Sequence, residues 1–229
     1  NWRTLSLEDE QELHNKNMNR VTDVCIPENQ AIRVLESHLL EAWKEASENT
    51  KRQLPHHFFF DVLRSESLLN ACEGDTSSSW VLAACEENVP IYVPGCEDTT
   101  MGNIFAARSM EGDINSDSVL SGIEYMKHLA TWYEEQTSPL AFLQIGGGIA
   151  GDFPICVVPM LNQDLERHVP LWSWFGQISE SRPSFGGYSG APPSEKITWG
   201  KIDAATPMFV VESDATIVAP LLFAYILNL

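Results

Sequence analysis

Lys201 has the surroundings in this sequence that most favour nucleophilic chemistry. It lies in the segment SEKITWGKID, two residues after Trp199 and six after Glu195. An amine that is desolvated beside an aromatic ring has a lowered pKa and can form an imine with a carbonyl carbon. The alternative is structural: the aliphatic part of the lysine packs on Trp199 while its ammonium reaches water. Composition alone favours this alternative, because most lysines are solvated.

A second candidate site is the glycine-rich segment QIGGGIAGDFP, which follows an apolar run. Glycines 146–148 at the end of a strand let backbone amides approach a pyrophosphate, and the N-terminus of a following helix adds partial positive charge. The segment has neither the GxGxxG spacing nor the lysine of a P-loop. A tight strand-to-helix turn without a ligand is therefore an equal alternative.

Alternating helices and strands are expected to position these segments. The first third of the chain is predicted to be helical, with Ser6 as an N-cap and a helix over residues 28–46, and a later amphipathic helix is predicted over 115–137. Short apolar runs predict strands at 90–93, 140–145, 171–179 and 208–213. Such alternation favours an α/β fold with a largely parallel sheet, in which ligands bind at the carboxyl ends of the strands.

Composition narrows the classes of function. The 229 residues are 44% apolar and suit one large domain, and 14 basic against 32 acidic residues give a net charge of −18, which opposes binding to nucleic acid or to an anionic membrane. The longest apolar stretch is too short to span a bilayer. Five scattered cysteines without CxxC spacing fit a reducing cytoplasm. The adjacent His56 and His57 cannot both face one metal from a regular element, so no metal site is expected.

The segment around Lys201 resembles the active-site segment of deoxyhypusine synthases. The similarity rests on SGAPPSEKITWGKI at 189–202 and VESDATIVAPLL at 211–222, with three further matches in order: LHNKNMNRVTDVCIPE at 13–28, VPIYVPGCEDTTMGNIF at 89–105 and FLQIGGGI at 142–149. The resemblance covers nearly the whole chain and is closest to a divergent bacterial branch. It implies a Rossmann-like α/β fold with helices flanking a largely parallel sheet, and residues 1–229 as one domain that forms the C-terminal two thirds of the family's fold.

The resemblance also implies an NAD-dependent transfer of a butylamine group. In the family, NAD oxidises spermidine, the butylamine part is held as an imine on a lysine that matches Lys201, and it passes to a lysine of the hypusine-bearing translation factor. The positions that match the polyamine site are Glu195, Trp199, Asn103, Gly186 and Tyr188. The positions that match NAD contacts are Asp98, Gly148, Glu180, Ser181, Asp214 and Ala215.

Three polar residues of the family's polyamine site are replaced in this chain. The resemblance places Phe153 at a histidine position, and Asn103 and Tyr188 at two aspartate positions. Tyr188 is a candidate proton carrier by residue type. Two alternatives follow: a homospermidine synthase that uses putrescine as acceptor, and a catalytically silent paralogue that activates a partner subunit.

The family's chain begins upstream of Asn1, which leads to an expectation about assembly. The missing part includes strands that hold the rest of NAD and a segment that gates the neighbouring active site. We expect Asn1 to be a cleavage point within a precursor, with the N-terminal fragment bound as a separate chain. The resemblance further implies a homotetramer or heterotetramer with sites at dimer interfaces.

Overall fold

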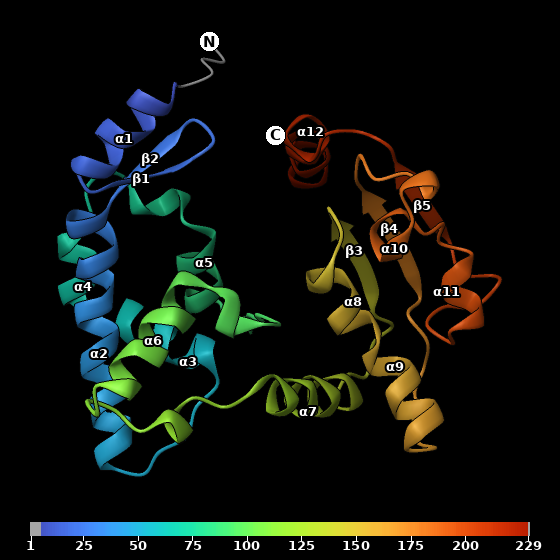
Figure 1. The fold of residues 1–229 in the computed structure, drawn as a ribbon. Helices are drawn as coiled ribbons and strands as arrows, with labels where there is room; N and C mark the ends of the chain where they lie inside the picture. Colours follow the sequence, from blue (N-terminus) through green and yellow to red (C-terminus); the bar gives the residue numbers. More distant parts are fainter. Residues whose placement is uncertain (1–5, 229) are drawn as a thin grey trace. The chain divides into compact units, whose positions relative to one another are not determined.

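The computed structural model describes residues 6–228, so the expected cleavage point at Asn1 lies outside the described residues. The chain divides into two compact units, Asn1–Ser121 (unit 1) and Gly122–Leu229 (unit 2), which follow one another in the colours of Figure 1. The expectation that residues 1–229 form one domain stays a prediction.

Unit 1 opens with a helix and a β-hairpin. Helix α1 (Leu7–Asn15) begins at the predicted N-cap, where Ser6 and Asp9 form a capping box. Strands β1 (Met18–Val21) and β2 (Val24–Pro27) then pair antiparallel, with Val21 opposite Val24. The expectation of helix throughout the first third is wrong here, because Thr22 adopts a positive φ of 53° that reverses the chain.

The rest of unit 1 is helical. A π-helical turn (Glu28–Ile32) leads into α2 (Arg33–Glu48), and α3 (Pro55–Leu63), α4 (Glu66–Ala71), α5 (Trp80–Glu86) and α6 (Thr100–Met110) follow. The apolar face of α2 buries Leu39 and Trp43 against Phe58 of α3. The strand predicted at 90–93 is wrong: this segment is irregular, and the prolines at positions 90 and 94 that bracket it lack the N–H that a sheet needs.

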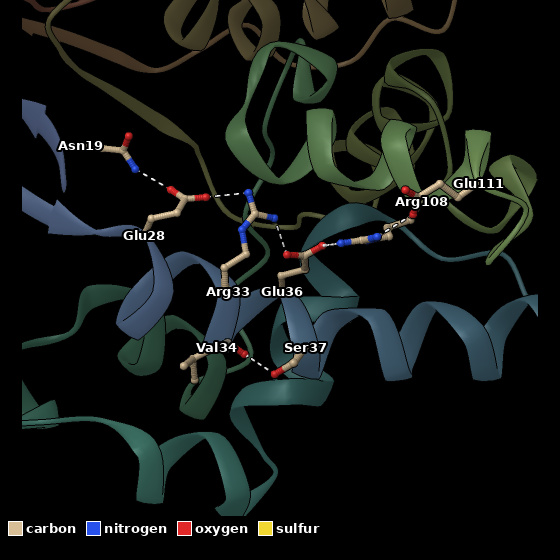
Figure 2. Close-up of polar contacts among 8 residues, drawn as sticks. All are labelled: Asn19, Glu28, Arg33, Val34, Glu36, Ser37, Arg108 and Glu111. Atoms are coloured by element: carbon tan, nitrogen blue, oxygen red, sulfur yellow. Dashed lines mark hydrogen bonds and ion pairs between the residues drawn. The ribbon is translucent and has the colours of Figure 1, made fainter. Parts of the chain in front are cut away.

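A chain of ion pairs ties α2 to α6 (Figure 2). The carboxylate of Glu36, which is buried, accepts hydrogen bonds from Arg33 and, at 2.8 Å, from Nε of Arg108. Each arginine also holds an outer acid, Glu28 or Glu111, at 2.5 Å. Burial acts to raise the pKa of Glu36, but the two arginines outweigh it and the pKa is lowered. The charge is thus retained inside unit 1 by two cationic partners.

Unit 2 is built on a three-stranded parallel sheet flanked by helices (Figure 1). Its strands, in the order β3-β4-β5, are β3 (Ala141–Ile145), β4 (Trp174–Ile178) and β5 (Met208–Val211), within the three predicted runs. The helices are α7 (Gly122–Glu134), α8 (Ile149–Ile155), α9 (Val157–Pro159), α10 (Gly187–Gly190), α11 (Glu195–Thr198) and α12 (Ala215–Leu227). The expected mixed α/β class is confirmed, although the helix predicted over 115–137 is α-helical only from Gly122 to Glu134.

Aromatic side chains form much of the core of unit 2. Phe142 of β3 stacks on Phe175 of β4 with ring centroids 6.0 Å apart, and Trp172 meets Phe142 edge-on at 5.1 Å. The indole N–H of Trp172 donates to the carbonyl of Ile155 at 3.3 Å, which fixes α8 against the sheet. Because the strands are parallel, their carboxyl ends meet at one edge of the sheet. Within residues 6–228, no helix combines the length and the apolar character that crossing a membrane requires.

Candidate functional site

Lys201 lies in a cavity of about 390 Å³ within unit 2, which we call the lysine cavity. The residue is 6% exposed, and its Nζ lies 3.1 Å from Oδ1 of Asp152. Its Nζ also lies 5.3 Å from the ring centre of Tyr188 and 5.9 Å from that of Trp199. The amine is therefore enclosed by two aromatic faces and one carboxylate.

The local fold turns Lys201 inward. Helix α11 is one turn long. Gly200 follows it with a φ of +67°, a backbone conformation that residues with a side chain rarely adopt. A Cβ at Gly200 would also lie 2.7 Å from Nε2 of Gln163. The backbone N–H of Lys201 donates to the carbonyl of Lys196 at 3.0 Å and closes the turn. As a result Trp199 stays 66% exposed at the mouth while Lys201 is buried.

Asp152 enters the lysine cavity from α8. The helix follows the glycine turn after β3, so the carboxyl end of that strand delivers the carboxylate. Oδ1 of Asp152 also accepts a hydrogen bond from the thiol of Cys156 at 3.4 Å. Burial raises the pKa of the Cys156 thiol. Asp152 therefore faces a lysine and an undissociated thiol.

Tyr188 forms another wall of the lysine cavity. Its phenol donates to Oε1 of Gln144, on β3, at 2.7 Å. Burial raises the pKa of Tyr188, so the phenol keeps its proton. A Cβ at Gly151 would lie 2.6 Å from the same amide oxygen, and the glycine therefore allows α8 to approach Gln144. Because its hydroxyl proton is already engaged, Tyr188 presents its ring to the cavity.

Lys196 also lines the lysine cavity, and sequence reasoning missed it. It is 3% exposed, and its Nζ has no hydrogen-bond partner among residues 6–228. The Nζ lies 4.6 Å from the ring centre of Phe175 and 5.1 Å from that of Tyr188. Burial lowers the pKa of Lys196, and the neighbouring charge of Lys201 lowers it further. The available signal was its position five residues before Lys201.

The polyamine positions expected from the sequence fall into both units. Glu195, Trp199, Tyr188 and Lys201 line the lysine cavity, and Gly186 lies two residues before Tyr188 with a φ of +71°. Asn103 belongs to unit 1, where it lines a cavity of about 550 Å³. Its amide N–H groups donate to the carbonyls of Glu97 and Thr99, at 2.9 and 3.0 Å. Its donors thus hold the start of α6.

Most of the expected cofactor positions lie at the carboxyl edge of the sheet. Gly148 ends the turn after β3, with φ +73°, and its N–H donates to Oγ of Ser189 at 2.8 Å. Glu180 and Ser181 follow β4. Asp214 caps α12, which begins at Ala215, and hydrogen bonds from the backbone and hydroxyl of Thr216 lower its pKa. Asp98 instead lies in unit 1, in the same cavity as Asn103.

The glycine turn after β3 leaves room for a close-lying ligand. The turn at 146–148 approaches Ser189 so closely that a Cβ at Gly147 would lie 2.3 Å from its Oγ, whereas a Cβ at Gly148 would meet nothing within 4 Å. Open space beside glycine is what a close-lying ligand requires. Acids and hydroxyls follow the two neighbouring strands at the same edge. The cofactor site at this edge stays a prediction, and the sequence did not single out Asp152, which lies inside the glycine-rich segment.

Comparison with known proteins shows the family of the chain. The family model for deoxyhypusine synthase matches residues 4–226. A deoxyhypusine synthase-like protein of Nostoc punctiforme is 35% identical over 160 residues, and one of Cyanothece sp. is 32% identical over 166 residues; each alignment covers 68% of this chain and 40% of the relative. The deoxyhypusine synthase of Arabidopsis thaliana is 26% identical over 215 residues, which are 93% of this chain and 54% of that protein. The chain thus spans about half or less of these relatives, and it belongs to the deoxyhypusine synthase family.

Proposed function

We propose that this chain carries the catalytic lysine of an NAD-dependent aminobutyl transferase. In this proposal the butylamine part of spermidine is held as an imine on Lys201 and passes to a lysine of the hypusine-bearing translation factor. The observation that carries the proposal is the burial of Lys201 in a cavity with one carboxylate and two aromatic faces. A solvated structural lysine, the alternative, would keep its ammonium in water.

The lysine cavity offers groups that suit a chain with amines and methylenes. The exposed indole of Trp199 and the ring of Tyr188 provide faces that attract a cation and pack against methylenes. Glu195 lies exposed at the same cavity, where its carboxylate can pair with a second ammonium. Asp152 holds Lys201 at 3.1 Å, so the amine is oriented before the substrate arrives.

NAD is the cofactor in this proposal, and the carboxyl edge of the sheet would hold it. The residues concerned at this edge are Gly148, Glu180, Ser181, Asp214 and Ala215. When bound, NAD would accept a hydride from a carbon of spermidine that bears an amine. The protein's own part is to bind the polyamine against the aromatic faces, to keep Lys201 in place through Asp152, and to exclude water from the buried amine.

The acceptor is tested by product analysis. The full chain, with any chain that copurifies, is incubated with NAD and labelled spermidine together with either the translation factor or putrescine. Label on a lysine of the translation factor supports the proposal, and labelled homospermidine supports the alternative acceptor. Absence of transfer to both, with NAD bound, supports the silent paralogue. The resemblance implies that Asn103, Phe153 and Tyr188 replace polar residues of the family's polyamine site, and this keeps both alternatives in the test.

We also propose that the protein acts as a cytoplasmic tetramer, either a homotetramer or a heterotetramer. Exposed apolar side chains support the presence of a partner: Phe209 on β5 is 60% exposed, and Leu221 and Tyr225 on α12 are 70% and 83% exposed. Five free cysteines suit a reducing compartment. Native mass spectrometry of the purified protein tests the assembly, and a lone monomeric chain would contradict it.

A further inference from the structure

Two lysines share the lysine cavity, but only one of them has a counter-ion. Lys201 pairs with Asp152 at 3.1 Å, whereas Nζ of Lys196 has no hydrogen-bond partner among the described residues. Buried polar side chains almost always have a partner, because an unsatisfied group lowers stability. An exception inside a candidate active site indicates that the amine is retained for its chemistry.

The backbone holds the two lysines together. The N–H of Lys201 donates to the carbonyl of Lys196 at 3.0 Å, so the short turn of α11 brings both residues to the same side. Their Nζ atoms lie 5.1 and 5.3 Å from the centre of one ring, that of Tyr188. Both amines therefore contact a single wall of the cavity.

The surroundings of the two amines differ. Burial and the charge of Lys201 lower the pKa of Lys196, against weaker opposing effects of Glu195 and Asp152. Lys201 has the carboxylate of Asp152 within hydrogen-bond distance, which suits an ammonium. The other nearby groups are not free bases: the thiol of Cys156 and the phenol of Tyr188 both donate hydrogen bonds.

We propose that Lys196 is the proton acceptor for Lys201, a role that rests on the imine chemistry proposed above. An ammonium has no electron pair for attack, so Lys201 must lose one proton before it can bond to carbon. In the proposed step this proton passes to the free electron pair of Lys196, directly or through a water. The neutral Lys201 then attacks an electrophilic carbon.

The step conserves the charge of the lysine pair. For an aldehyde, a bond forms between Nζ of Lys201 and the carbonyl carbon and gives a neutral carbinolamine. Lys196 then returns its proton to the hydroxyl, water leaves, and a protonated imine remains on Lys201. While it carries the proton, the ammonium of Lys196 lies over the faces of Phe175 and Tyr188, at 4.6 and 5.1 Å.

Reductive alkylation of the lysines tests this role without NAD or a polyamine. The full chain is treated with butyraldehyde and cyanoborohydride between pH 6 and pH 10, and the rate of labelling at each lysine is measured by peptide mass spectrometry. Loss of a general base slows a reaction by about 10²-fold or more. We therefore expect Lys196→Met to slow the labelling of Lys201 by that order at pH 7 and to reach the wild-type rate near pH 10. The exposed Lys127 serves as an internal control whose rate is the same in both proteins.

A second variant separates proton transfer from charge. Lys196→Arg places a permanent positive charge at this position and does not accept a proton at these pH values, so Lys201 is expected to label slowly at pH 7 in this variant as well. A wild-type rate in Lys196→Arg, an unchanged pH profile in Lys196→Met, labelling of Lys196 in place of Lys201, or an inert Lys201 at pH 10 would each overturn the proposal. Because neither NAD nor spermidine is present, failure of the proposed transfer reaction is a separate result.

Discussion

Replacing Lys196 with methionine is expected to stabilise the protein. The side chain is 3% exposed and its Nζ has no hydrogen-bond partner in the described part of the chain. An unsatisfied buried polar group costs about 1–3 kcal/mol, and methionine fills a similar volume without it. Weak contacts of the amine with Phe175 and Tyr188 reduce the benefit. We expect a net gain of about 1–2 kcal/mol in the free energy of unfolding at pH 7.

The gain must depend on pH with a definite sign. A lysine whose pKa is lowered on folding binds protons more tightly in the unfolded state. The lysine therefore lowers the stability of the folded protein below its ordinary pKa of 10.5, and this effect vanishes above that pH. Urea unfolding followed by tryptophan fluorescence measures the gain at pH 7 and again near pH 10, where it should shrink. Lys127→Met, at an exposed site of the same unit, is the matched control and should change little. A variant less stable than wild type at pH 7, or a gain that does not vary with pH, would refute the reasoning.

Three further substitutions test other parts of the structure. Glu36→Gln should lower the free energy of unfolding by about 2–3 kcal/mol at pH 7, because it removes the carboxylate that two arginines share. The pKa of Glu36 is lowered in the folded protein, so the difference in stability between wild type and variant should fade as the pH falls below 4.5. Urea unfolding measures this difference. Trp199→Leu should raise KM for spermidine by about 2- to 30-fold in steady-state assays, with an unchanged melting temperature, because the indole offers a cation–π contact and is 66% exposed. Gly147→Ala should weaken the binding of NAD by about 2- to 10-fold in calorimetry, because the new Cβ would lie 2.3 Å from Oγ of Ser189. Gly122→Ala is the control: its Cβ would meet nothing within 4 Å, so NAD binding should not change.

The strands and the position of the site could be predicted because strong local patterns coincide with them. The runs that became β3, β4 and β5 are apolar and rich in branched or aromatic residues, and each is followed by glycine or small polar residues. Lys201 could be recognised because its neighbours at 195 and 199 form a specific motif. Each of these features depends on residues that are close together in the sequence, so a local pattern is enough to predict it.

The missed features depend on contacts between distant segments. No sequence pattern singles out Lys196. Its amine is buried without a hydrogen-bond partner among the described residues because Phe175 and Tyr188 pack around it. Asp152 lies 49 residues before Lys201, the lysine that it pairs with. The hairpin at 18–27 was missed because its two-residue turn, at Thr22, contains no glycine or asparagine to indicate a positive φ.

The central claim is that Lys201 forms the imine, and trapping tests it most directly. The protein, with any chain that accompanies it, is incubated with NAD and spermidine, treated with borohydride, and mapped by mass spectrometry. We expect a butylamine adduct on Lys201 that requires NAD and is absent from Lys201→Arg. No adduct on Lys201 in a protein that still binds NAD, or an adduct on another lysine, would contradict it.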